Sequence, residues 1–152
     1  MTRRIPTKNE LQTLDFDSQS GLEFIGWYVT FPSDDLDSDM IMGMLKECLE
    51  KVKNNQIEFP VDSYNNYEDL AYILGAVYAD CYVSKLKWQV SFFEDLEDYC
   101  VVSPDNKFAI QFNTVTYKIL TGQQENTVLL GYNMISANSF PEQLGSEISF
   151  IS

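Results

Sequence analysis

Two long stretches of the chain carry apolar residues at the spacing of an α-helix. In the first, from Asp37 to Asn55, apolar positions recur at helical intervals and charged ones fall largely on the other side. Its stripe consists of Ile41, Met44, Leu45, Cys48, Leu49 and Val52. The second stretch runs to about Leu86, with a stripe that consists of Leu70, Ile73, Leu74, Val77 and Cys81. Both patterns predict amphipathic helices, and small residues in the second would allow another element to approach closely: Gly75, Ala76 and Ala79.

Capping residues indicate where helices begin. Thr7, with Glu10 three residues later, has the form of a capping box and predicts a short helix over residues 7–14. Asn65 with Glu68 has the same form, and it marks the start of the second long helix.

Beyond Leu86 the apolar period changes from about 3.6 residues to 2, which predicts strands. Trp88, Val90 and Phe92 alternate with polar neighbours, and after the segment YCVV come the turn SPDNK and two more alternating sets: Phe108, Ile110 and Phe112, then Val115, Tyr117 and Ile119. The turn TGQQEN leads into TVLLGYNMI, which completes a meander. Residues 21–31 are rich in aromatic and branched side chains and predict a further, buried strand. The last dozen residues predict an edge strand or a loose tail.

Helices first and strands afterwards indicate an α+β fold, with N-terminal helices packed on a C-terminal antiparallel β-meander. The 152 residues fit a single domain, residues 1–152. A hydrophobic content of 45% supports a globular chain with a real core.

The charge is strongly negative, with 23 acidic against 10 basic residues and a net charge of -13. Such a field repels phosphate backbones and anionic lipids, so nucleic acids and membrane surfaces are not expected partners. It would speed encounter with a basic protein, and that gain would fall as salt rises. High negative charge also simply aids solubility, so the charge alone does not decide between these roles.

The three cysteines, Cys48, Cys81 and Cys100, form no CxxC pair, and two of them fall on the predicted helical stripes. They are expected to be free and to act as small hydrophobic side chains rather than as a disulfide framework or a zinc site. The N-terminal segment lacks the apolar stretch of a secretory signal, and no run of apolar residues is long enough to cross a membrane. These features predict a cytoplasmic protein.

No motif for catalysis is present. The chain contains no histidine, which excludes Ser–His and Cys–His arrangements within it. Asp35, Asp37 and Asp39 have the first spacings of a calcium loop, but Met40 and Lys46 stand where that loop requires glycine and a bidentate acid. Helix capping explains these aspartates better. We therefore expect no enzyme activity, no cofactor and no metal site.

The stretch SFFEDLEDYC places four carboxylates around one leucine between two predicted strands. A polar turn is the simplest interpretation. If the strand keeps its alternation, Phe93 points away from the Trp88 face, and an exposed aromatic ring beside acids suits an interface with a basic protein. Alternatively, Phe93 turns inward or covers the edge of the core. The candidate partner-binding residues are Phe93, Glu94, Asp95, Glu97, Asp98 and Tyr99.

From about Glu68 to Ile135 the order of motifs is a helix with Leu-Gly, a tryptophan strand, an acidic turn, a short strand, a hydrophobic strand and a V-x-K strand. The matching positions are Leu74, Gly75, Trp88, the Glu94–Asp98 turn, Phe112, Val115 and Lys118. This order resembles small bacterial domains of unknown function, although their usual glycine in the acidic turn is missing here. The resemblance implies the order of elements and no chemistry. The small, acidic, single-domain character also resembles immunity proteins of bacterial toxin systems, which bind and block a cognate toxin.

These observations lead to the hypothesis of a cytoplasmic interaction protein: an immunity-type inhibitor that occludes the active site of a basic toxin. The alternative is a non-catalytic small-molecule or housekeeping binding module, which could be a homodimer built on the meander. An enzyme ranks third and would require carboxylates from distant segments to converge, such as Glu23 and Asp80. The oligomeric state stays open.

Overall fold

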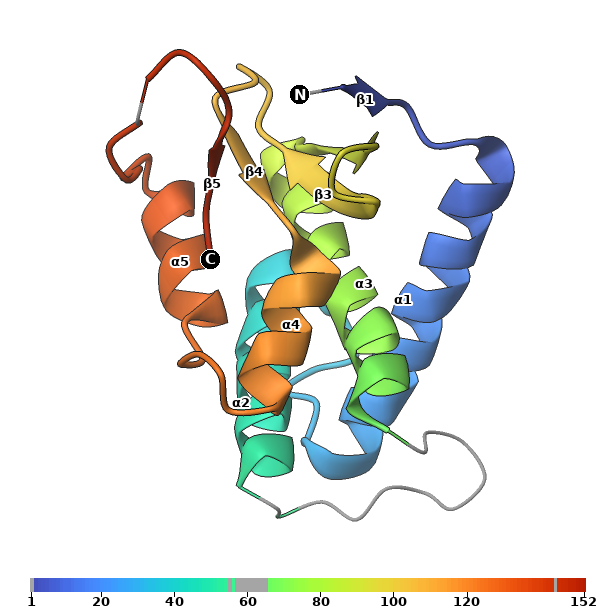
Figure 1. Cartoon of the computed structure of the whole chain (residues 1–152). Coiled ribbons are helices and arrows are strands. Elements are labelled where there is room, and N and C mark those ends of the chain that lie inside the picture. Colours follow the sequence, from blue (N-terminus) through green and yellow to red (C-terminus); the bar gives the residue numbers. More distant parts are fainter. Residues whose placement is uncertain (1, 55, 57–65, 144) are drawn as a thin grey trace.

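The computed structural model describes residues 2–54, 56, 66–143 and 145–152. Within these ranges the chain forms five helices, α1 (Lys8–Tyr28), α2 (Ser38–Lys53), α3 (Tyr67–Leu86), α4 (Phe112–Leu120) and α5 (Val128–Ser136). The strands are β1 (Arg3–Arg4), β2 (Gln89–Phe93), β3 (Asp98–Val102), β4 (Phe108–Ile110) and β5 (Ser149–Phe150). The α+β class is confirmed, and the strands gather at one end of the helical layer (Figure 1).

Helix α3 is the centre of the molecule, and it packs against α1, α2 and α4 (Figure 1). Every residue of its predicted stripe is buried, and so are several residues outside it, because neighbouring helices surround it. Asn66 caps its start by accepting a hydrogen bond from the backbone N–H of Asp69 at 2.8 Å. The predicted cap at Asn65 lies outside the described residues.

Helix α1 corrects the N-terminal prediction. The capping box of Thr7 and Glu10 is confirmed, but the helix continues to Tyr28, so the strand predicted over residues 21–31 is wrong. The buried residues of α1 follow a helical period: Ser18, Gly21, Phe24 and Ile25. Contact with α3 overrides the strand preference of the aromatic and branched side chains, because burial stabilises more than local propensity.

Helix α2 agrees with its predicted stripe. Five of the six stripe residues are buried, Ile41 is partly buried, and Met42 is buried in addition. Asp37 caps the helix by accepting a hydrogen bond from the N–H of Met40 at 2.8 Å. The capping role predicted for this aspartate-rich stretch is therefore confirmed.

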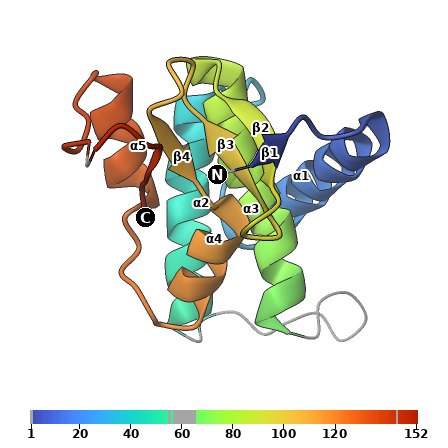
Figure 2. The ribbon, with the colours of Figure 1, turned by 45° about the horizontal axis from the view of Figure 1, so that its top comes forward.

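The five strands form one sheet in the order β1-β2-β3-β4-β5, antiparallel except for the parallel pair β4 and β5. The hairpin of β2 and β3 pairs Phe92 with Tyr99 and Phe93 with Asp98. The predicted SPDNK turn joins β3 to β4, where the N–H of Asn106 donates to Ser103 O at 2.9 Å. Figure 2 shows β1 beside this hairpin, close to the start of α1.

The predicted meander ends after β4. Val115 and Ile119 are not in a strand but in α4, whose buried residues recur at helical spacing, and the segment TVLLGYNMI forms most of α5. The helix forms because α4 packs closely on α3 at Gly75: a Cβ there would lie 3.1 Å from Cα of Asn113. Helices therefore follow the strands as well as precede them, and of the C-terminal tail residues Ser149–Phe150 form the edge strand.

The sheet separates two apolar clusters. One face joins the main helical core through Val101 and Ile110, and Trp88, just before β2, belongs to the same core. The other face carries a small cluster of Phe93, Cys100, Val102 and Ala109, with Leu96 and Ile148 packed against it. The three cysteines are free, as predicted, and Cys100 is buried along with the two on the helical stripes.

Candidate partner-binding groove

The acidic stretch lies where the sequence places it, in the connection between β2 and β3. Glu94, Asp95 and Glu97 are exposed. Hydrogen bonds close the turn: the N–H of Leu96 donates to Phe93 O, and that of Glu97 donates to Glu94 O, each at 3.2 Å. The three carboxylates thus project from a defined hairpin turn.

Phe93 is not the exposed anchor that strand alternation predicts. It does point to the face opposite the main core, but that face is covered and Phe93 is 0% exposed. Its ring contacts that of Phe150, with centroids 5.6 Å apart. The alternative in which Phe93 covers the edge of the core describes this structure.

Tyr99 is partly buried and ties the hairpin to α1. Its hydroxyl donates a hydrogen bond to the Glu10 carboxylate, which also accepts from Arg4 Nη1 at 2.7 Å. The Arg4 guanidinium lies over the Phe92 ring, 4.5 Å from its centroid. Arg4 is the main reason why the pKa of Glu10 falls from 4.5 to about 2, and the Thr7 backbone N–H adds to the effect. Tyr99 therefore has a structural partner.

Asp98 differs from the other acids of the stretch. It begins β3 and faces α4, where its Oδ2 accepts hydrogen bonds from Thr114 Oγ1 at 2.8 Å and Gln111 Nε2 at 3.3 Å. Burial raises the pKa of this carboxyl, and the two hydrogen bonds offset only part of the effect. Sequence reasoning grouped Asp98 with the exposed rim, whereas the structure places it at a neighbouring groove.

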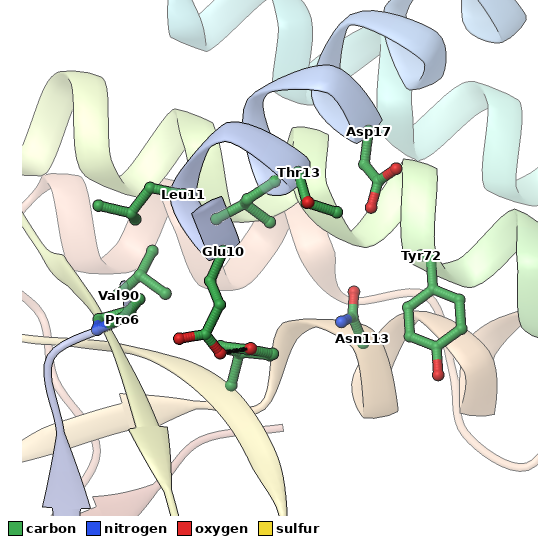
Figure 3. Close-up of a pocket in the computed structure, with 10 residues that line it drawn as sticks. Pro6, Glu10, Leu11, Thr13, Asp17, Tyr72, Val90 and Asn113 are labelled. Atoms are coloured by element: carbon green, nitrogen blue, oxygen red, sulfur yellow. Dashed lines mark hydrogen bonds between the residues drawn. The ribbon is translucent and has the colours of Figure 1, made fainter. Parts of the chain in front are cut away.

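Two adjoining cavities of about 230 and 580 Å³ form this groove and share Tyr72 and Asn113. The smaller lies between α1, α3 and the strands, and Figure 3 shows Asp17 and Asn113 pointing into it with Tyr72 at one end. The larger lies between α3, α4 and the acidic turn, and its walls include Asp98. Together they run from Pro6 to the far end of α4, alongside the acidic turn.

The groove combines acidic and aromatic side chains. Three acids line its larger part: Glu68, Glu97 and Asp98. Among the described lining residues of that part, Lys118 is the single cation. Asp17 lines the smaller part, and burial raises its pKa. Among the residues that the structure describes, neither Asp17 nor Asp98 has an ion-pair partner.

Two tyrosines at the groove provide the exposed aromatic surface that Phe93 does not. Tyr72 on α3 is 48% exposed and Tyr117 on α4 is 40% exposed. Sequence reasoning singled out neither for partner binding. Tyr72 lies outside the apolar stripe of its helix, and this position indicates exposure from the sequence alone. Tyr117 gives no such signal, because its segment predicts a strand but forms helix α4.

The carboxylates named for an enzyme do not converge. Asp80 lines a third cavity with Asp15 and Ser18, and Glu23 is exposed and does not line it. Burial and the neighbouring Asp15 raise the pKa of Asp80. Within the described ranges, no three His, Cys, Asp or Glu side chains form a group that could hold a metal ion.

Comparison with known proteins gives no assignment: no family model, no curated protein and no solved structure matches this chain. Among the helices of the described residues, none is long and apolar enough to cross a membrane.

Proposed function

We propose that this chain is a cytoplasmic interaction protein of the immunity-inhibitor type, which binds a basic toxin and occludes its active site. The observation that carries the proposal is the exposed acidic turn, Glu94, Asp95 and Glu97, beside a groove with exposed Tyr72 and Tyr117. Aromatic side chains next to a charged rim are typical of binding hot spots.

The acids and the tyrosines would act at different stages of binding. The carboxylates of the turn steer a basic surface toward the groove, and this long-range attraction weakens as salt screens it. The rings of Tyr72 and Tyr117 are then buried against the partner, and the loss of their hydration water on binding slows dissociation. Phe93 and Tyr99, which the sequence suggested as anchors, instead stabilise the hairpin within the chain. Phe93 contacts Phe150, and the Tyr99 hydroxyl donates to Glu10.

The first experiment captures partners from lysate of the source organism at low and raised salt, with two baits besides the natural chain. One bait carries Glu94→Gln, Asp95→Asn and Glu97→Gln. The matched control carries Asp34→Asn, Asp35→Asn and Glu142→Gln, which removes the same charge from exposed positions elsewhere.

The proposal expects one basic protein that the natural and control baits retain and the turn variant loses, with retention falling as salt rises. With the purified partner, the turn variant should slow association about tenfold or more at low salt. Equal retention by the turn variant and the control would contradict the acidic-turn mechanism.

The alternative is a small-molecule binding module, and the smaller cavity favours it. That cavity is partly enclosed by α1 and offers the Asp17 carboxylate, the Asn113 amide and apolar wall residues to a compact ligand. A ligand that raises the melting temperature of the natural chain, with Asp17→Asn abolishing the increase, would support this function instead.

A further inference from the structure

Asp98 is a partly buried carboxylate, and within the described part of the chain its oxygens accept hydrogen bonds from neutral donors alone. Thr114, Gln111 and the backbone N–H of Tyr99 donate to it, the last at 2.8 Å. Glu10, which lines the same groove, pairs with Arg4 instead. Burying a carboxylate without a cation costs free energy, so a cation that reached Asp98 would gain more than one at an exposed acid.

The groove has room for such a cation on a flexible stem. Its larger part, about 580 Å³, exceeds the volume of any one side chain, and its walls include Ala71 and Leu96 beside the two tyrosines. A methylene chain packs favourably on such walls, and the faces of tyrosine rings attract ammonium and guanidinium groups.

We propose that the groove receives a lysine or arginine side chain of the basic partner, whose cation pairs with Asp98 while its stem lies against Tyr72 and Tyr117. This inference rests on the proposed function and identifies what the groove would recognise. Charge complementarity favours this occupant, because carboxylates outnumber cations among the described residues that line the groove, and the whole chain carries a net charge of -13.

Asp17 gives the groove a second carboxylate without an ion-pair partner within the described part of the chain. It lines the smaller cavity, which joins the larger one at Tyr72 and Asn113. A segment with two basic residues can therefore offer one cation to Asp98 and one to Asp17. Lys118 opposes this occupant, since its charge lines the larger cavity.

The test measures binding of a capped, unstructured peptide of glycine, serine and two arginines, and of its citrulline counterpart, which has the same shape without the charge. Affinities are compared for the natural chain, for Asp98→Asn, and for Asp35→Asn as a matched control. Both variants remove one negative charge, but Asp35 is exposed, lies outside the acidic turn and does not line the groove.

We expect Asp98→Asn to weaken arginine-peptide binding about tenfold or more, Asp35→Asn to weaken it about twofold or less, and the citrulline peptide to show no such difference. Lys118→Gln should strengthen binding. Equal effects of Asp98→Asn and Asp35→Asn would overturn the inference, because they would reflect net charge alone. Equal affinity for butylamine and the peptide would also overturn it, since the groove would then recognise a free amine.

A second pair of variants keeps the test decisive if Asp98→Asn does not fold. Tyr72→Ala should weaken peptide binding several-fold, whereas Phe16→Ala, which is 68% exposed on α1 outside the groove, should leave it unchanged. The two proposals fail separately. If partner capture depends on the acidic turn but Asp98 shows no preference, only this inference is overturned; if Asp98 shows the preference but the turn has no effect on capture, only the acidic-turn function is.

Discussion

Two aspartates, Asp39 and Asp98, each lie at the start of an element but differ in their charge partners and in the direction of their pKa shifts. Asp39, in the first turn of α2, pairs with Lys85 of α3 at 2.5 Å and accepts a hydrogen bond from the Tyr132 hydroxyl of α5 at 2.8 Å. Asp98, at the start of β3, has only neutral hydrogen-bond donors among the residues that the structure describes. The pKa of Asp39 is lowered, mainly by Lys85, whereas burial raises that of Asp98.

Asp39 forms contacts between helices and its charge has a cation partner within the chain, whereas the charge of Asp98 has no such partner among the described residues. Asp39 links three helices, and its charge is neutralised within the chain. Asp98 lines a groove and gains no such compensation from the residues that the structure describes. Perturbed carboxyls in grooves are functional candidates for this reason, and the contrast between Asp39 and Asp98 supports the proposal that a partner binds on the groove side.

The largest change in stability is expected at the contact between α1 and α3 on the groove side. A Cβ at Gly21 of α1 would overlap the Ile73 carbonyl oxygen of α3 and lie 2.6 Å from Val77 Cγ2. Gly21→Ala should therefore destabilise the chain by about 1–3 kcal/mol, measured by urea denaturation. Gly43→Ala in α2 is the matched control, because no atom of the described residues lies within 4 Å of its Cβ position, and it should stabilise the chain by up to about 1 kcal/mol. Similar effects of the two would show that α1 does not pack as described.

The sequence predicts the elements whose pattern is purely local. Helices α2 and α3 have regular stripes, and the capping box at Thr7 and the hairpin turns depend on neighbouring residues. It fails at α1 beyond residue 20 and at α4 and α5, where aromatic and branched residues favour strands but contact with other elements selects helix. Those contacts join residues far apart in the chain, so no window along the sequence reveals them.

The candidate site divides in the same way. The exposed acids of the turn follow from their hairpin position, because turns lie at the surface. The burial of Phe93 depends on the C-terminal strand, and the environment of Asp98 depends on Thr114 in α4. Both are tertiary contacts, so sequence reasoning predicted the place of the acidic turn and missed the groove beside it.

A smaller effect is expected from the paired acid. Asp39→Asn should lower the free energy of unfolding by about 0.5–1 kcal/mol at neutral pH, a modest value because the ion pair is partly exposed and screened by solvent. Since the folded-state pKa of Asp39 is lowered, its contribution is present above the unfolded pKa of 3.8 and is lost as the pH falls through the folded value. Asp35→Asn, at an exposed position, should change nothing. Urea denaturation at neutral pH and at pH 3 checks both statements, and an unchanged stability at neutral pH would remove Asp39 from the comparison.

Within the groove itself, Glu10 offers a paired acid to set against Asp98. Arg4→Gln should raise the pKa of Glu10 from about 2 toward 4.5, measured by NMR titration of its side-chain carboxyl. Because the folded pKa is depressed, the stability that the pair supplies is present above 4.5 and is lost as the pH falls toward 2. Arg3→Gln is the control, since the Arg3 side chain bonds to Asn106 instead. If the Glu10 titration did not move in Arg4→Gln, the link between β1 and α1 would not be the ion pair described here.

The smallest change in stability is expected at Asp98. Asp98→Asn should alter the free energy of unfolding by less than about 0.5 kcal/mol, because the lost hydrogen-bond strength is offset by the removal of an uncompensated buried charge. The pKa of Asp98 is raised above 3.8, so its charge destabilises the fold at neutral pH, and that penalty disappears as the pH falls through the folded value. Carboxyl titration by NMR should therefore place the pKa of Asp98 above 3.8 and that of Asp39 below it, and binding of the arginine peptide should lower the pKa of Asp98 and leave that of Asp39 unchanged. The reverse order would mean that Asp98 already has its cation in solution, and the contrast between the two aspartates would no longer mark the groove as the binding side.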